Sequence, residues 1–502
     1  MKRFRDILSS QDSFAFTYEL VPSRGSSGAG IDKMLKFAEE ATASGMIDAL
    51  SLTDNAGGGP ACSPDDFARE IQAAGMETIV HFAAKDANRN GLEARALSLD
   101  RCGLDNLLVL SGDFPINANE GLAKPVFDLD STQLVNYLRR MNDGLKIAGQ
   151  EDKFALAEKT DFFMGCAVSS FKSTEPELMN QYYKLEKKIL AGAHYVICQL
   201  GYDMRKYSEL LTYMKERKLT VPAMASVFVL RRGVARVMNR GAVPGCVVTD
   251  ELVDTLCKEF ESPDKGKGAA LERTAQQIAM LKGIGYNGAH IEGFGLKFDD
   301  VRIVVERSKE IGDNWRDYEE GFRYSPKGSY FVYDKSKQYE EPKAPFRPRR
   351  SMLIYSAMKF VHTLFFTKGE SFKMKKSVMA KVEKWGLFMK AFHMMENLSK
   401  ECLFDCRDCG DCALPDMFYL CPESQCPKHQ RVGPCGGSHD GICEVHDDRF
   451  CVWCDVYMRA KSAGKLDELR EKFILPRNWE LHNTSSWVNF YLERDHSAGD
   501  GN

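Results

Sequence analysis

Between residues 14 and 295 the chain repeats one pattern eight times: a short apolar, β-rich run followed by a longer amphipathic stretch. This alternation is typical of βα units around a parallel sheet. The runs are Phe16 to Val21, Ala49 to Thr53, Thr78 to Phe82, Asn106 to Ser111, Phe162 to Val168, Tyr195 to Leu200, Pro222 to Val227 and Gly288 to Phe294. Eight units predict an α/β (β/α)₈ TIM barrel. A doubly wound sheet is the alternative, and it is less favoured because no GxGxxG follows the first run.

Changes in composition divide the chain into four segments. The barrel is expected over residues 1–312, with helices between the strands at Ile31 to Ser44, Glu93 to Cys102, Thr132 to Ala148, Pro176 to Ala191 and Leu271 to Lys282. Residues 313–350 carry Pro342, Pro345 and Pro348 among many charges, which indicates a linker or extended arm. Residues 351–400 have helical spacing and predict two helices, separated near Gly369, that pack on the barrel or on the following segment. Residues 401–496 form a cysteine-rich, metal-binding domain.

Overall charge and hydrophobicity exclude several classes of protein. The 68 Lys and Arg residues nearly balance the 71 Asp and Glu residues, so no strong field points to nucleic acid. No uncharged apolar run reaches the roughly 18 residues that span a bilayer, and the charged N-terminus has no signal-peptide core. We therefore expect a cytoplasmic protein that binds neither nucleic acid nor membrane.

Polar residues gather where the predicted strands end, which is where TIM barrels place reacting groups. The set comprises Glu19, Thr53, Asp54, Asn55, His81, Ser111, Gly112, Asp113, Ser169 to Phe171, Gln199, Ser226, His290 and Glu292. Taken singly, an acidic member may cap a helix or pair with an arginine, and His81 may be a hydrogen-bonded core histidine. The glycine-rich loop from Asn55 to Pro60 can bring backbone N–H groups close to a ligand, yet a flexible turn has the same composition.

Four ordered motifs carry a family resemblance: Tyr18-Glu-Leu-Val-Pro-Ser-Arg24, Ser51-Leu-Thr-Asp-Asn55, His81-Phe-Ala-Ala-Lys-Asp-Ala-Asn88 and Leu108-Val-Leu-Ser-Gly-Asp113. With Lys184 to Gly192 and Cys198-Gln-Leu-Gly201, the segment from about residue 14 to 295 resembles methylenetetrahydrofolate reductase. The resemblance implies an FAD held across the barrel mouth without a Rossmann fingerprint. It also implies a folate substrate and interconversion of 5,10-methylenetetrahydrofolate and 5-methyltetrahydrofolate by hydride transfer.

The same resemblance implies roles for individual residues. Glu19 would be the general acid for opening the folate ring, Asp113 would tune charge near the flavin, and Gln199 would bind the pterin. The residues implied to contact the flavin are Thr53, His81, Ser111, Gly112, Asp113, Phe171 and Lys188, with Lys188 facing the phosphates. Ser111 stands where some members have arginine, and no clear nicotinamide-stacking aromatic follows the seventh run. The electron donor is therefore left open between NAD(P)H and ferredoxin.

Ten of the sixteen cysteines fall between residues 402 and 454. They are Cys402, Cys406, Cys409, Cys412, Cys421, Cys426, Cys435, Cys443, Cys451 and Cys454. Closely spaced CxxC steps let one loop surround a metal, and the spacing suits either a [4Fe-4S] cluster or zinc. A disulfide scaffold is less favoured in a reducing cytosol. Ten ligands allow two four-cysteine sites with two to spare.

The cysteine segment, through Pro434-Cys-Gly-Gly-Ser438 and Cys451-Val-Trp-Cys454, resembles the C-terminal domain fused to or partnered with certain methylenetetrahydrofolate reductases. That resemblance favours at least one [4Fe-4S] cluster over zinc, an electron-transfer protein or subunit as partner, and an oligomer. Two other functions stay open: a methyltransferase-type barrel that binds methyltetrahydrofolate, and a scaffold subunit of a larger redox complex.

Overall fold

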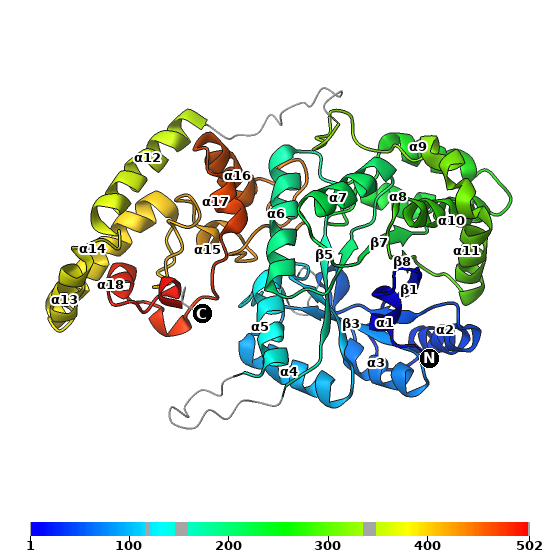
Figure 1. The fold of residues 1–502 in the computed structure, drawn as a ribbon, viewed down its shortest axis with the longest axis horizontal. Coiled ribbons are helices and arrows are strands. Elements are labelled where there is room, and N and C mark those ends of the chain that lie inside the picture. The colour runs from blue at the N-terminus through cyan, green and yellow to red at the C-terminus, as the bar shows by residue number, and fades with distance from the viewer. Residues whose placement is uncertain (1, 116–120, 146–158, 335–347, 500–502) are drawn as a thin grey trace.

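Eight parallel strands form a closed barrel in the computed structural model, which describes residues 2–115, 121–145, 159–334 and 348–499. Each strand is bonded to the next, and β8 is bonded back to β1 (Figure 1). The strands are β1 Ala15–Leu20, β2 Ala49–Leu52, β3 Thr78–Ala83, β4 Asn106–Leu110, β5 Phe163–Val168, β6 Tyr195–Cys198, β7 Ala223–Phe228 and β8 Gly288–Glu292. The predicted TIM barrel is confirmed.

Helices alternate with the strands and surround the barrel. They are α2 Ala29–Ser44, α3 Pro64–Ala73, α4 Arg89–Arg101, α5 Ser131–Asp143, α6 Glu175–Ala191, α7 Met204–Glu216, α8 Arg232–Asn239, α9 Asp250–Glu259, α10 Lys267–Ile284 and α11 Phe298–Ile311. The helix predicted from Thr132 to Ala148 ends earlier, at Asp143, because Gly144 adopts a φ of 98°. Its predicted last residues, 146–148, lie outside the described residues.

The short helix α1 (Phe4–Leu8) closes the end of the barrel where the strands begin. The Phe4 ring is fully buried against Phe163 and Tyr195. Tyr195 fills the barrel interior beside Gly165, where an added Cβ would lie 2.2 Å from the tyrosine ring. Since described residues fill this end, we expect a ligand to approach from the opposite end, at the carboxyl ends of the strands.

Residues 312–334 differ from the extended arm that the sequence suggested. The 3₁₀ segment η2 (Gly312–Gly321) buries Trp315 against Gly283 of α10, and Phe331 lies beneath the Lys206 ammonium, 4.0 Å from the ring centre. Phe322 is also buried. These aromatic side chains keep the segment on the barrel. The rest of the predicted linker, 335–347, lies outside the described residues, and the next helix starts at Pro348.

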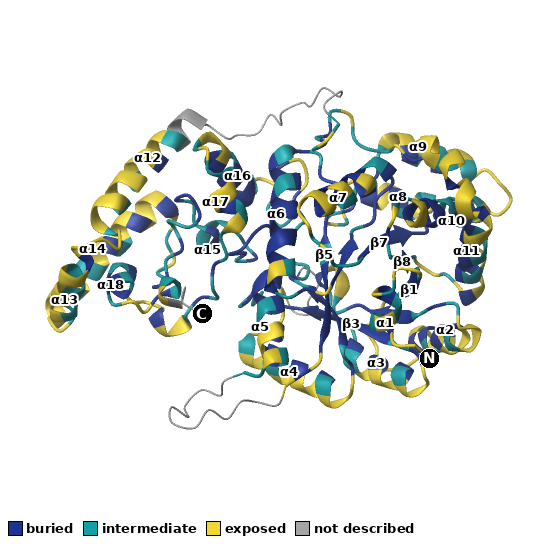
Figure 2. Cartoon of the chain, in the orientation of Figure 1, coloured by how far each residue is buried: buried dark blue, intermediate teal, exposed yellow. Residues whose placement is uncertain are grey.

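Three helices, rather than the two predicted, follow the linker: α12 Pro348–Phe365, α13 Phe372–Val382 and α14 Gly386–Phe404. Tyr355 and Met358 of α12 pack into the hydrophobic cluster of the cysteine-rich segment. The expected packing is wrong for most of the other apolar positions, and Figure 2 shows these helices as largely exposed. The exposed side chains include Val361, Leu364, Phe365, Trp385 and Phe388.

The cysteine-rich segment, which we call the module, lies against α6 (Figure 1). Its helices are α15 Pro422–Gln425, α16 Val452–Ser462, α17 Leu466–Glu471 and α18 Ser486–Tyr491. Because the module covers it, α6 is buried on most of its surface (Figure 2). Asn180 donates to the Trp453 carbonyl, and the Lys184 ammonium donates to the carbonyls of Gly433 and Pro434. Over the described ranges, no helix has the length and apolar character needed to cross a bilayer.

Candidate active site

Three ionisable side chains meet inside the barrel where β1 and β8 end. The strand register places Thr17 opposite His290, so Glu19 and Glu292, each two residues farther along, project from the same face. One atom, Nε2 of His290, lies 3.8 Å from a Glu19 carboxylate oxygen and 3.9 Å from a Glu292 oxygen. Nδ1 of the same ring is bonded to the Thr17 hydroxyl at 2.7 Å. We call Glu19, His290 and Glu292 the acid triad.

The two carboxyl groups of the acid triad have different pKa values. Burial opposes ionisation of Glu19, but the adjacent His290 outweighs burial and lowers the pKa of Glu19. Burial, followed by the charge of Glu19, raises the pKa of Glu292 to about 8. Burial disfavours the imidazolium form of His290, yet the two neighbouring carboxyls raise its pKa overall. At neutral pH Glu19 is ionised and Glu292 keeps its proton, with the His290 ring between them.

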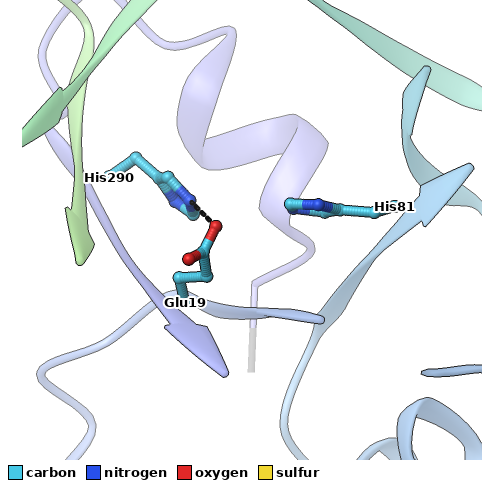
Figure 3. A group of neighbouring side chains, drawn as sticks. All are labelled: Glu19, His81 and His290. Atoms are coloured by element: carbon cyan, nitrogen blue, oxygen red, sulfur yellow. Dashed lines mark ion pairs between the residues drawn. The ribbon is translucent and has the colours of Figure 1, made fainter. Parts of the chain in front are cut away.

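His81 from β3 faces the Glu19 carboxylate from the other side (Figure 3). Donor atoms of Glu19, His81 and His290 lie within 4.8 Å of one another. The Ser51 hydroxyl is bonded to Nε2 of His81 at 2.8 Å, and burial lowers the pKa of His81 to about 4. His81 is therefore a neutral hydrogen-bonding group, and the structure brings it together with Glu19 as the sequence predicted.

The glycine-rich loop and Asp113 meet at the same end of the barrel. The Gly57 N–H donates to the Asp113 carboxylate at 2.7 Å, and Asn55 orders the loop with a φ of 48° and a bond to Asp86. The loop is therefore held over the strand ends rather than free. Thr53 is buried at the base of this loop, where its N–H donates to the Leu20 carbonyl.

Two other predicted flavin residues contact the module. The Ser111 hydroxyl donates to the Gln430 side chain at 2.9 Å, and the Gly112 carbonyl accepts from the Lys428 ammonium at 2.9 Å. Lys428 also pairs with Glu444 at 2.5 Å. The module is thus anchored directly at the end of β4, next to Asp113.

The remaining predicted residues lie in the wall between the barrel and the module. Lys188 is buried and donates to the Ala167 carbonyl at 2.7 Å, and burial lowers its pKa to about 8. Phe171 packs on Gly201 and Tyr207. The Gln199 side chain accepts from the Leu200 N–H at 3.0 Å. None of these contacts of Lys188 and Phe171 involves the acid triad.

Eight of the ten module cysteines fall into two groups. Cys426, Cys435, Cys443 and Cys451 line one cavity and form the proximal group. The Cys435 thiol donates to Glu444 at 3.0 Å, and Glu444 pairs with Lys428, so two side chains join this group to the Gly112 carbonyl. Cys406, Cys409, Cys412 and Cys421 are close enough for electrostatic interaction and form the distal group.

Each group offers four thiols, which is the donor set of both zinc and [4Fe-4S] sites. The two groups therefore fit either kind of site. Cys402 is exposed, and Cys454 is buried beside Cys451.

Comparison with known proteins agrees with this architecture. Residues 3–302 match the family described as methylenetetrahydrofolate reductase, and these residues make up more than half of the chain. The chain belongs to the methylenetetrahydrofolate reductase family. Residues 388–480 match the family described as methylene-tetrahydrofolate reductase C terminal, which covers α14 and most of the module. Both resemblances noted in the sequence are thereby confirmed.

Individual relatives are distant. The chain is 24% identical over 185 residues to methylenetetrahydrofolate reductase 2 of Saccharomyces cerevisiae, a match that spans 36% of this chain and 28% of that protein. An uncharacterised Clostridium thermocellum protein described as binding two copies of 5-methyl-5,6,7,8-tetrahydrofolic acid has a TM-score of 0.42 at 15% identity, over 61% of this chain and 98% of its own. A 2,3-dimethylmalate lyase has a TM-score of 0.34 at 12% identity, over 70% and 97%. Neither structural likeness is close enough to inform the site.

Sequence reasoning assigned no role to several residues that the structure places at the site. His290 and Glu292 were noted only as polar strand ends, although their two-residue spacing on a predicted strand was a readable signal that they share a face. Lys428, Gln430 and Glu444 come from the module. No sequence signal connected them to strand β4, because their contacts with it depend on how the module packs.

Proposed function

We propose that this protein interconverts 5,10-methylenetetrahydrofolate and 5-methyltetrahydrofolate by hydride transfer through FAD, with Glu19 as the general acid. The observation that carries the proposal is the acid triad where β1 and β8 end, in a barrel of this family. The Glu19 side chain is 22% exposed there, and a carboxyl group largely shielded from water is suited to protonating a ring nitrogen as the folate ring opens. In the proposal, Asp113 tunes charge near the reacting centre and Gln199 binds the pterin.

The barrel mouth has features that fit a bound flavin and folate. Within the described part of the chain, His290 Nε2 and the Ser169 hydroxyl are buried without a hydrogen-bond partner, which is typical of atoms that await a ligand. In the proposal the flavin is lined by Thr53, His81, Ser111, Gly112, Asp113, Phe171 and Lys188. FAD, when bound, would supply the hydride. The protein side chains would orient the folate, exclude water and move the proton.

The same proposal assigns a [4Fe-4S] cluster to the proximal group of cysteines, with zinc as the alternative. Its support is the four-thiol cavity and its short connection through Glu444 and Lys428 to the strand end beside Asp113. The distal group would be a second metal site. Electrons from a ferredoxin or a partner subunit would then enter through the module, and NAD(P)H is the alternative donor. Such thiol chemistry suits a reducing cytoplasm.

An absorbance spectrum of the anaerobically purified protein, with iron and zinc analysis, tests the cofactors. Flavin bands and about four irons per cluster are expected. Bound zinc without iron would show that the cysteines hold a structural metal and not a cluster. A protein that binds methyltetrahydrofolate but no flavin would instead be a methyltransferase-type barrel.

Substitution of Glu19 tests the chemistry. In Glu19→Gln, the reduction of methylenetetrahydrofolate by the flavin should slow by about 10²-fold or more, because the amide cannot donate an acid proton. Flavin content should stay unchanged. A wild-type rate in Glu19→Gln would remove Glu19 from the mechanism. A flavin-containing wild type without folate turnover would favour a scaffold subunit of a larger complex.

A further inference from the structure

A single imidazole nitrogen in the barrel lies beside two carboxyl groups. The His290 ring is 2% exposed, and the Thr17 hydroxyl fixes its Nδ1. Its Nε2 forms no hydrogen bond within the described residues and lies 3.8 Å from Glu19 and 3.9 Å from Glu292. A shift of about 1 Å brings either oxygen within hydrogen-bond distance. The nitrogen can therefore exchange a proton with each carboxyl in turn.

Several titratable groups that pack around Glu19 and Glu292 are uncharged at neutral pH. His81 faces Glu19 and is kept neutral by burial, which lowers its pKa to about 4. Cys246, Tyr202 and Tyr207 lie near Glu292, and burial raises the pKa of each of them, so they stay uncharged at neutral pH. Tyr18 beside Glu19 is uncharged for the same reason. The His290 ring thus lies between an ionised Glu19 and a neutral Glu292.

This distribution presents a difficulty for the proposed chemistry. Glu19 must be protonated to act as an acid, yet it is the carboxyl that His290 holds in the ionised form. Protonated Glu292 is placed on the far side of the same nitrogen and is 9% exposed, so it is shielded from bulk water. Glu292 therefore holds a proton that Glu19 lacks, and only the His290 side chain lies between the two carboxyl groups.

We propose that Glu292 stores the proton that Glu19 donates to the folate and that His290 passes it between them. The inference rests on the proposed function and adds two residues to it, Glu292 as a proton store and His290 as a relay. The N–H bond at His290 Nε2 breaks as the O–H bond of Glu19 forms. The O–H bond of Glu292 then breaks as Nε2 is protonated again. Overall, Glu292 becomes a carboxylate and Glu19 a carboxylic acid, and solvent later restores the Glu292 proton.

The protonation state of Glu292 can be measured without substrate. Infrared difference spectra of the purified full-length protein between pH 6 and pH 9 should show a protonated carboxyl band that is lost near pH 8. The band should be absent in Glu292→Gln and present in Glu209→Gln, which removes another buried carboxyl, in α7. An unchanged band in Glu292→Gln, or the absence of a band in the wild type, would overturn the proposal.

Single-turnover kinetics test the delivery of the proton. The bound flavin is reduced with dithionite, mixed with methylenetetrahydrofolate, and followed by its absorbance as it reoxidises. Glu292→Gln should slow reoxidation about 10- to 100-fold at pH 7 and abolish the decline in rate that the wild type shows above about pH 8. Flavin reduction by dithionite should be unchanged, and Glu209→Gln should match the wild type.

The double variant distinguishes a relay from two independent structural effects. If His290 and Glu292 act as one unit, His290→Gln combined with Glu292→Gln should be little slower than the slower single variant. Fully multiplicative losses, or a Glu292→Gln rate and pH profile equal to wild type, would overturn the relay. A wild type whose reduced flavin is not reoxidised by the folate would instead contradict the proposed function, and the infrared result would still stand on its own.

Discussion

The barrel and the module are stabilised in different ways. The barrel has a closed ring of strand-to-strand hydrogen bonds and a continuous hydrophobic core that extends from α2 to α11. The module has short helices and a smaller core, and most of its cysteines are half-buried. Of the twelve non-glycine residues with positive φ in the described chain, eight lie after residue 400. Such backbone is strained and needs external restraint.

This difference indicates which interactions stabilise the folded state of each region. We expect the apolar burial and backbone hydrogen bonding of the barrel to keep it folded without the module. The module lacks comparable regular structure, so we expect its contacts with α6 and β4 and the metal proposed at its cysteines to supply the remainder.

Removing one proximal ligand should unfold the module and leave the barrel folded. Cys426→Ser should lose the metal of the proximal group and the melting transition of the module, because metal binding there contributes directly to folding. The control is Cys102→Ser, an exposed barrel cysteine, which should behave as wild type. Metal analysis and limited proteolysis measure the effect. A folded, protease-resistant module in metal-free Cys426→Ser would show that the contrast is wrong.

Removing the Asp130 carboxylate should weaken the association between the barrel and the module. Asp130 accepts the N–H groups of Arg431 and Val432 from the module and also caps α5 through Thr132 and Gln133. Asp130→Ala should cost about 3 kcal/mol in urea unfolding, since several buried donors lose a charged acceptor.

The matched control for this interface is Asp143→Ala at the far end of α5. Asp143 is exposed and forms a surface ion pair with Arg139, so a change below about 0.5 kcal/mol is expected. Equal effects of the two substitutions would mean that the module does not depend on this contact.

Overfilling the barrel interior should affect the barrel transition first. At Gly165 a Cβ would lie 2.2 Å from the Tyr195 ring, so Gly165→Ala should destabilise the barrel by about 1–3 kcal/mol. Gly233→Ala in α8 meets nothing within 4 Å and should be neutral or slightly stabilising. Thermal unfolding followed by circular dichroism compares the two. If Gly165→Ala lowers the melting temperature of the module and leaves that of the barrel unchanged, the contrast between the two regions is wrong.

The smallest effect expected is a pH-dependent gain in barrel stability. The pKa of Glu292 is raised by burial to about 8, so the wild type loses stability as the pH rises from the ordinary glutamate pKa to about 8. Glu292→Gln avoids this loss. Its melting temperature relative to wild type should therefore be higher at pH 9 than at pH 7, by the equivalent of about 1–2 kcal/mol. The same difference at both pH values would show that Glu292 is not protonated in the folded barrel.

Much of the barrel could be predicted because its signals are local. Each strand is a short apolar run, and every observed strand begins and ends within two residues of its predicted bounds. Glu19 and His81 could be placed together because parallel strands in a barrel bring their carboxyl ends to one side. The positions of Trp315 and Phe331 on the barrel were missed, because the charged, proline-containing composition around them concealed the aromatic anchors.

The sequence by itself determined the eight βα units, the family and a segment rich in potential metal ligands, since these depend on periodicity and on residue types at fixed spacing. Only the tertiary structure decided that His290 lies between two carboxyls and that α6 is buried under the module. Only the tertiary structure divided eight cysteines into a proximal and a distal group. Those facts depend on strand register and on packing between segments hundreds of residues apart, which no local pattern records.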